Sequence, residues 1–149
     1  MDEQRSEPQY SEWVLPKWSS FLPVLMIYPT LWLTFVPINE TVGTISGLAI
    51  SLLAVALMFA KSARITVTES ELRVKNAVID RKFIFDVNVI DANDSFYARG
   101  NGLDFRAWVH FQGSVTTLVR VIINDPEDPT PYWLFSTRNP EELKKVLGF

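Results

Sequence analysis

The distribution of apolar residues divides the chain into a continuous apolar part and a part made of short alternating runs. Two uncharged stretches, residues 18–36 and 42–60, are separated by a connection of five residues. As a helix, each would be about 28 Å long, close to the roughly 30 Å hydrocarbon core of a bilayer. The pattern therefore predicts a transmembrane hairpin of two antiparallel helices over residues 18–60, preceded by an N-terminal arm, residues 1–17.

Basic residues flank this hairpin but are absent from its turn. Arg5 and Lys17 precede the first span, Lys61 and Arg64 follow the second, and residues 37–41 contain no lysine or arginine. Loops rich in lysine and arginine stay in the cytoplasm. We therefore expect a multi-pass protein of the cytoplasmic (inner) membrane with both termini, and hence the arm, on the cytoplasmic side.

Small residues and prolines characterise the two spans. Pro23 and Pro29 predict a kinked first helix, since proline removes a helical hydrogen bond that neighbouring groups must replace in lipid. Gly43, Gly47 and Ser51 recur every four residues and would share one helical face that allows close approach of another helix. Two alternatives stay open for this face: packing against the first helix of the same hairpin, or a homo-oligomer contact.

Residues 61–149 alternate between apolar and polar positions, which predicts a β-rich cytoplasmic domain. The expected strands cover residues 65–68, 72–75, 78–85, 87–92, 106–112, 116–123 and 132–136. The turn-rich segment 93–104 is expected to be a loop that contains at most one short helical turn. Gly113 and Ser114 suggest a hairpin between the two strands that flank them.

The C-terminal segment carries the clearest helix signal of this domain. Asn139 is placed to cap a helix, and Pro140 suits its first position, which predicts a helix over residues 140–147. Leu143, Val146 and Leu147 would share one face and cover the sheet. The expected fold class is therefore membrane α+β: a two-helix transmembrane hairpin followed by a small antiparallel β-sheet domain closed by a C-terminal helix.

Composition removes several functional classes. The absence of cysteine excludes disulfides and thiolate metal sites. Equal numbers of acidic and basic residues after Ala60 argue against a nucleic-acid partner. The single histidine, His110, has no identifiable catalytic or ligand partners, and we expect no cofactor, no metal and no enzymatic activity.

Two sets of residues are candidates for binding. The acidic, proline-rich turn at residues 125–131 leads into Tyr132 and Trp133; its carboxylates suit either a rigid turn or a hard cation. Tyr132, Trp133 and Trp108 are the predicted contacts with a protein partner. The juxtamembrane basic residues are the predicted contacts with lipid headgroups: Lys61, Arg64, Arg73 and Lys75.

The run from Asp125 through Trp133 to Leu143, with its repeated Asp-Pro and Thr-Pro steps, resembles the C-terminal signature of a family of small actinobacterial membrane proteins, domain of unknown function 3093. The likeness extends to Tyr10, Glu12 and Trp13 in the arm and to the hairpin, whereas residues 93–113 match least. The family has no established activity, so the resemblance implies location and architecture only. Residues 61–149 also resemble, more weakly, bacterial pleckstrin-homology-like domains.

These observations favour a non-enzymatic, membrane-anchored protein-interaction module at the inner face of the cytoplasmic membrane. The alternative is a protein that binds lipid or a small molecule at the membrane surface, through its basic cluster or its kinked first helix.

Overall fold

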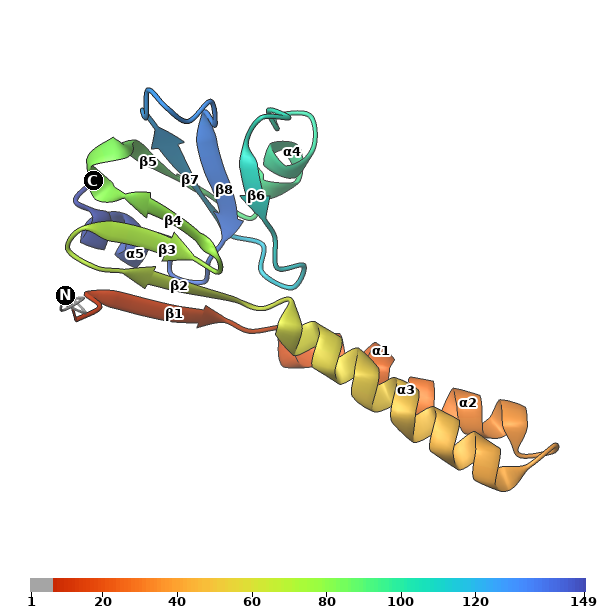
Figure 1. Ribbon diagram of the computed structural model, residues 1–149. Coiled ribbons are helices and arrows are strands. Elements are labelled where there is room, and N and C mark those ends of the chain that lie inside the picture. The colour runs from red at the N-terminus through yellow and green to blue at the C-terminus, as the bar shows by residue number, and fades with distance from the viewer. Residues whose placement is uncertain (1–6) are drawn as a thin grey trace. The chain divides into compact units, whose positions relative to one another are not determined.

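The structure is a computed structural model, and it describes residues 7–149. The chain forms two compact units: a hairpin unit, Leu15–Ser62, and a β unit, which comprises the chain up to Val14 together with Ala63–Phe149 (Figure 1). The hairpin unit is thus inserted into the sequence of the β unit after its first strand.

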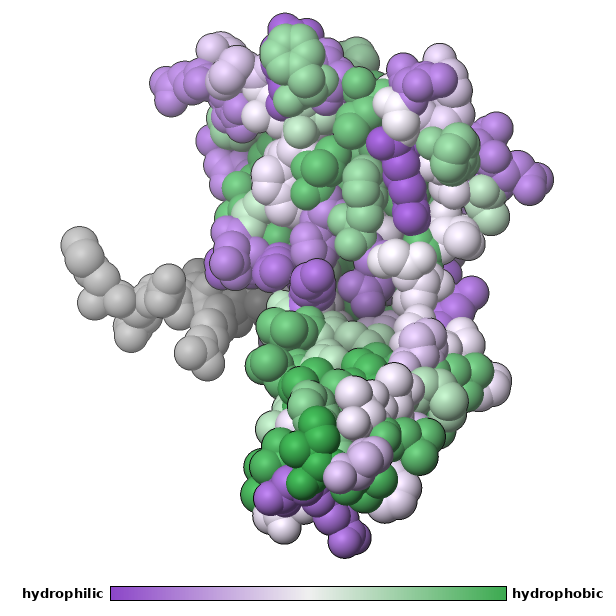
Figure 2. Space-filling model, turned by 90° about the vertical axis from the view of Figure 1, so that its right-hand side faces the viewer, coloured by the Kyte–Doolittle hydropathy of each residue, from purple (hydrophilic) through white to green (hydrophobic). Residues whose placement is uncertain are grey.

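The hairpin unit contains two apolar helical stretches that are long enough to cross a membrane, Trp18–Phe35 and Glu40–Ala60. Their mean hydropathies are 1.2 and 2.2, and hydrophobic residues cover much of the hairpin face that Figure 2 shows. The helical elements are η1 (Trp18–Phe21), α1 (Leu22–Leu25), α2 (Ile27–Phe35) and α3 (Glu40–Ala60). The two predicted apolar helices are therefore confirmed as helices of membrane-spanning length.

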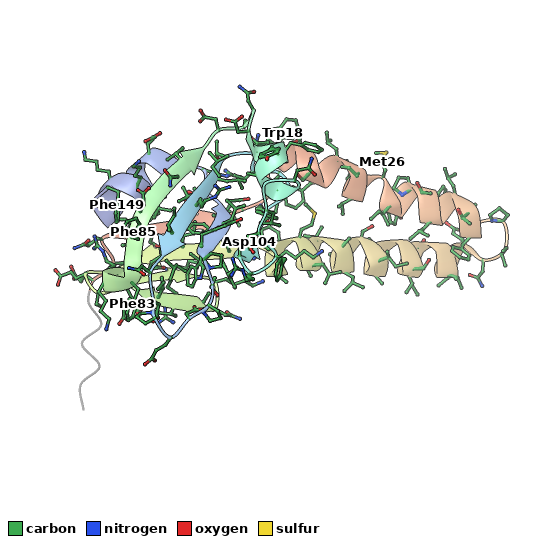
Figure 3. The ribbon with its side chains drawn as sticks, turned by 90° about the horizontal axis from the view of Figure 1, so that it is seen from above. Trp18, Met26, Phe83, Phe85, Asp104 and Phe149 are labelled. Carbon is green, nitrogen blue, oxygen red and sulfur yellow. The ribbon has the colours of Figure 1, made fainter. Side chains whose placement is uncertain are left out.

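The first stretch is broken at Met26, between α1 and α2 (Figure 3). Pro29 has no N–H to donate to the carbonyl of Leu25 four residues earlier, and α1 ends at Leu25. The hydroxyl of Thr30 donates to the carbonyl of Met26 at 2.7 Å. The predicted kink is thus confirmed, and the Met26 carbonyl at the break accepts both the backbone N–H and the hydroxyl of Thr30.

The glycines of α3 pack against the first arm of the same hairpin. A Cβ atom added at Gly43 would lie 3.2 Å from the carbonyl oxygen of Trp32, and one at Gly47 would lie 3.0 Å from the ring of Tyr28. Both glycines are buried. Of the two alternatives for the small-residue face, packing within the hairpin is observed at Gly43 and Gly47, and the homo-oligomer contact stays a prediction.

This close approach predicts that Gly47→Leu separates the two arms. Overpacking of a tight contact costs about 1–3 kcal/mol, so the SDS concentration at which helicity is lost, measured by circular dichroism, should fall. Ala49→Leu adds a similar side chain at an exposed position of the same helix and should leave the midpoint in place. Equal midpoints for the two variants would contradict the observed packing.

The β unit is built from two four-stranded sheets. Sheet A has the order β1-β2-β3-β4 and sheet B the order β5-β7-β8-β6. The strands of sheet A are β1 (Tyr10–Val14), β2 (Ala63–Val67), β3 (Glu71–Val74) and β4 (Ala77–Asp80). Those of sheet B are β5 (Ile84–Ile90), β6 (Trp108–His110), β7 (Leu118–Ile123) and β8 (Tyr132–Ser136), and the remaining elements of the unit are η2 (Arg81–Phe83), α4 (Ser95–Arg99) and α5 (Pro140–Leu147).

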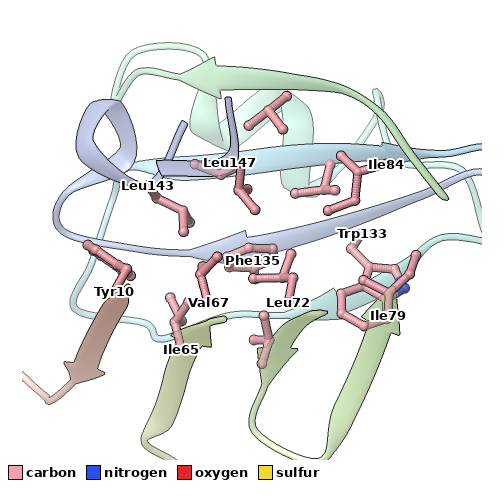
Figure 4. Close-up of a cluster of buried hydrophobic side chains, with 14 of the residues drawn as sticks. Tyr10, Ile65, Val67, Leu72, Ile79, Ile84, Trp133, Phe135, Leu143 and Leu147 are labelled. Carbon is pink, nitrogen blue, oxygen red and sulfur yellow. The ribbon is translucent and has the colours of Figure 1, made fainter. Parts of the chain in front are cut away.

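The main core lies between the inner faces of the two sheets and is closed by α5 (Figure 4). Strands of sheet A bury alternate residues, as the period of two requires. Central strand β8 is buried on both faces: Trp133 and Phe135 enter the main core, whereas Leu134 joins a second cluster with Ala98 and Leu118. The α+β class is therefore confirmed, but with two sheets in place of one.

Three details of the predicted strands are wrong. The expected strand 78–85 is interrupted at η2, where the Arg81 side chain donates to the carbonyls of Thr68 and Val146. The expected hairpin at Gly113 and Ser114 is absent, because β6 pairs in parallel with β8. That pairing places the Trp108 ring 4.9 Å from the Trp133 ring at the edge of the core. The predicted purely antiparallel sheet is corrected accordingly.

The third correction concerns the N-terminal arm, for which no strand was predicted. Tyr10–Val14 forms β1, which pairs antiparallel with β2 across the inserted hairpin, with Val14 opposite Ala63. By contrast, the predicted C-terminal helix is confirmed as α5, with Leu143 and Leu147 buried. The side chain of Asn139 does not cap α5 as predicted; its backbone carbonyl accepts from Leu143 instead.

Candidate functional site

The aromatic residues predicted to contact a partner are largely part of the core. Trp133 is only 5% exposed, and Trp108 is half-buried against it. The hydroxyl oxygen of Tyr132 accepts a hydrogen bond from the backbone N–H of Asp104 at 2.7 Å. Trp133 is therefore not exposed to a partner in this structure, because β8 is an inner strand of sheet B and presents its side chains to both packed faces.

The most exposed aromatic residues of the β unit lie instead on the segment that contains α4. We call residues 93–106 the α4 loop. Phe96 and Phe105 are 88% and 94% exposed, and Tyr97 is also exposed. Large aromatic side chains expose so much apolar surface only at a cost in water, and they are enriched where proteins contact partners. The α4 loop is therefore the candidate interaction surface.

Contacts on the inner side hold the α4 loop against sheet B. Ala98 is buried and Leu103 half-buried, and both join the second cluster with Leu118 and Leu134. The Arg99 guanidinium donates to the carbonyl of Val115 at 2.6 Å, and its burial lowers the pKa of Arg99. Because these contacts fix the backbone, the exposed rings are presented in a defined arrangement, which reduces the entropic cost of binding.

An ion pair between Asp104 and Arg106 fixes the C-terminal end of the α4 loop. The Arg106 guanidinium makes two hydrogen bonds to the carboxylate of Asp104, at 3.2 and 2.9 Å. Hydrogen bonding from Arg106 lowers the pKa of Asp104, and the Arg106 guanidinium lies 5.9 Å from the centre of the Phe105 ring. The pair therefore keeps Asp104 ionised while Phe105 projects outward.

Sequence reasoning missed these residues because the turn-rich segment was interpreted only as a connection. The available signal was the presence of three large aromatics in a stretch otherwise made of turn residues: Phe96, Tyr97 and Phe105. Loops with such residues commonly carry function. Residues 93–106 thus combine the composition of a loop with the exposed apolar area of a binding surface.

Three of the four predicted headgroup contacts are brought together on the outer face of sheet A and its edge. Arg64 lies on β2 and Arg73 on β3, and both point away from the core. Lys75 is in the turn after β3, where its N–H donates to the carbonyl of Arg64 at 2.9 Å. Trp13 is directly opposite Arg64 on β1 and was not among the predicted residues. Lys61 directly follows α3 and belongs to the hairpin unit.

A buried polar cluster ties β1 to the segment between β8 and α5. Glu12 is only 8% exposed, and its carboxylate accepts hydrogen bonds from the hydroxyls of Tyr10 and Thr137 and from the N–H of Arg138 at 2.8 Å. Burial and, secondarily, the bond to Glu12 raise the pKa of Tyr10 above its usual range. Tyr10 therefore stays protonated and donates, and we interpret this cluster as a structural tie.

The acidic turn before β8 uses its carboxylates for turn hydrogen bonds. Asp125 accepts from the N–H of Glu127, and Asp128 accepts from the N–H of Thr130, each at 2.9 Å. Among residues 7–149, no three His, Asp or Glu side chains are grouped so that they would hold a metal ion. The geometry of the turn is thus that of an Asx-stabilised connection. The single histidine, His110, lies away from this turn in the sequence, on β6, with its ring stacked on Trp108.

Within the hairpin unit, an apolar groove of about 400 Å³ separates the two arms beyond Gly47. Tyr28 and Ser51 border it at the glycine end. Phe21 also lines the groove, and its ring lies 5.9 Å from the ring of Phe59. The groove has a volume within the range of small-ligand pockets, about 300–1,000 Å³.

The fold and these surfaces define a small α+β domain into which an apolar helical hairpin is inserted after the first strand. A model of the family described as protein of unknown function (DUF3093) matches residues 9–147, and the chain belongs to this family. The match begins just before β1 and ends with α5. No curated protein and no solved structure matches the chain, so the likeness to pleckstrin-homology-like domains stays a prediction.

Proposed function

We propose that this protein is a non-enzymatic, membrane-anchored interaction module whose α4 loop binds another protein. In this proposal the hairpin unit crosses the cytoplasmic membrane with both ends on the cytoplasmic side, which accords with the basic residues that flank it and with the lengths of its two helices. The β unit is then held in the cytoplasm at the inner face of the membrane.

The observation that carries the proposal is the exposure of Phe96 and Phe105 on a loop whose other side is fixed to the core. A flexible loop would lose conformational entropy when it binds, whereas this loop is already ordered by Leu103, Arg99 and Tyr132. Exposed aromatic anchors on a rigid support are typical of the residues that dominate binding energy in protein interfaces. The partner is therefore expected to offer apolar pockets that accept the two rings.

The experiment compares two variants of the full-length protein expressed in its native membrane. Phe96→Ser combined with Phe105→Ser should reduce recovery of a stoichiometric partner at least tenfold, since each hot-spot aromatic contributes about 2 kcal/mol or more. Recovery is measured by crosslinking, mild-detergent purification and quantitative mass spectrometry.

Phe85→Ser provides the matched control, because Phe85 is also well exposed but lies on β5, outside the α4 loop. This variant should recover the partner at the wild-type level. The proposal fails if the double variant retains the partner, or if the wild-type protein is recovered alone.

A further inference from the structure

We infer that the outer face of sheet A, at the end where β1 and β2 join the hairpin, is a binding site for anionic phospholipid headgroups. We call this surface the basic sheet face; it consists of Trp13, Arg64, Arg73 and Lys75. The inference rests on the membrane anchoring proposed above and adds a lipid class and a second binding surface, separate from the α4 loop.

Strand register brings these residues together. Trp13 pairs with Arg64 between β1 and β2, and Arg73 lies on β3 opposite Thr66 of β2. The neighbours of Trp13 and Arg64 along each strand, such as Val14 and Ala63, are buried. Since successive side chains of a strand point to opposite faces, Trp13, Arg64 and Arg73 are directed outward, and Lys75 is exposed in the turn that follows β3.

Charge on the basic sheet face is incompletely neutralised by the protein. Arg73 forms an exposed ion pair with Glu71 at 3.0 Å, and the Arg64 guanidinium donates a long hydrogen bond to the Ser11 hydroxyl, at 3.4 Å. Within residues 7–149, neither Arg64 nor Lys75 forms an ion pair with a carboxylate. Arg64 and Lys75 are therefore available to an external anion, whereas Glu71, which pairs with Arg73, and Asp80 opposite it are the acidic neighbours on β3 and β4.

Two residues occupy positions that folding alone does not favour. Trp13 is 61% exposed on a strand whose opposite face is packed in the core. Lys75 has a φ of 56°, a left-handed conformation that favours glycine or asparagine. Residues kept in unfavourable conformations often serve a function. A tryptophan beside lysine and arginine is the combination found at the headgroup level of membranes.

Chain connectivity indicates which anion the basic sheet face binds. Only residues 15–17 separate Val14 from the first apolar helix, and only Lys61 and Ser62 separate the second from Ala63. Trp13 and Arg64 therefore lie next in sequence to the segments proposed to enter the bilayer. Of the anions that would satisfy Arg64 and Lys75, the phosphates of the inner leaflet are the ones that this connectivity favours.

The experiment uses full-length protein reconstituted in nanodiscs of zwitterionic lipid, with or without anionic phospholipid. Because the chain has no cysteine, Val78→Cys on the outer face of β4 gives a single site for an environment-sensitive dye. We expect dye emission to rise with the fraction of anionic lipid. Arg64→Gln combined with Lys75→Asn should abolish most of this rise, since each basic residue near an anionic surface contributes about 1 kcal/mol, or fivefold in affinity.

Controls separate binding from folding and from net charge. Lys82→Gln combined with Lys145→Gln removes the same charge elsewhere on the β unit and should keep the response. Lys75→Asn alone should keep or raise the melting temperature, because asparagine tolerates a positive φ. A dye on Phe85→Cys, which lies on sheet B, should report no lipid dependence.

Failure of this inference is distinguishable from failure of the proposed function. Absence of a lipid-dependent rise, or an unchanged rise in the Arg64→Gln/Lys75→Asn variant, overturns the inference even if partner binding through Phe96 and Phe105 persists. Inorganic phosphate that suppresses the rise more than sodium chloride of equal ionic strength indicates a soluble anion as ligand, and this result also overturns it. Failure of the protein to insert into nanodiscs would overturn the membrane anchoring itself.

Discussion

Replacing Trp133 with alanine is expected to lower the free energy of unfolding of the β unit by about 3–5 kcal/mol, the usual cost of truncating a large buried aromatic. Trp133 lies on inner strand β8, between β7 and β6, and belongs to the core that the two sheets and α5 enclose. Its removal would also take away the ring against which Trp108 packs. Urea unfolding of the full-length protein in detergent, followed by circular dichroism, measures the loss.

The matched control for this prediction is Phe105→Ala. Phe105 is almost fully exposed, so its truncation should change stability by no more than about 0.5 kcal/mol. Similar stabilities for wild type and the Trp133→Ala variant would show that the indole is not a core residue. The contrast also bears on function: a Trp133 variant that loses a partner would do so through unfolding, whereas a Phe105 variant tests contact directly.

The parts of the fold that the sequence predicted are those set by local periodicity. The two apolar stretches became the helices at Trp18–Phe35 and Glu40–Ala60, and the Asn-Pro start with spaced leucines became α5. Each depends on residues within one or two helical turns of one another. The same holds for β2 and β3, whose alternation is regular and whose connection is a short turn.

The parts that the sequence did not predict depend on contacts between distant residues. In β1 the alternation of apolar and polar residues is broken at its centre: Tyr10 and Val14 point inward as expected, but charged Glu12 also points inward and Trp13 points outward. A pattern-based rule therefore finds no strand, and the partner strand β2 lies beyond the whole hairpin. Local rules fail most often at strained or functional sites, and here Glu12 and Trp13 carry the polar tie and the proposed lipid contact respectively.

The burial of the predicted contact residues escaped sequence reasoning for a related reason. The sequence does not distinguish Trp108 and Trp133 from Phe96 and Phe105, because all four are aromatic residues close to turn residues. Parallel pairing of β6 with β8 buries Trp133 and half-buries Trp108, whereas packing of Ala98 and Leu103 orients α4 so that its aromatics face outward. Strand order thus determines which of these aromatic residues are buried and which are exposed, and local patterning does not encode strand order.

Glu12→Ala is the second variant with a large expected effect, a loss of about 2–4 kcal/mol in the free energy of unfolding. The substitution removes one acceptor group that serves three donors: the hydroxyls of Tyr10 and Thr137 and the N–H of Arg138. Buried donors left without a partner pay their full desolvation cost, and bonds to a charged group contribute about 1.5–3 kcal/mol each, with incomplete additivity. Urea unfolding in detergent measures the loss as for Trp133.

Local opening distinguishes this tie from an ordinary core contact. Because Glu12 joins an edge strand to the segment before α5, its loss should raise amide hydrogen exchange first in β1 and in residues 137–139, before the inner strands of sheet B respond. Glu141→Ala removes an exposed carboxylate from the first turn of α5 and should leave exchange in β1 unchanged. Uniform acceleration across both sheets in the Glu12 variant would contradict a tie that acts locally between the two ends of the β unit.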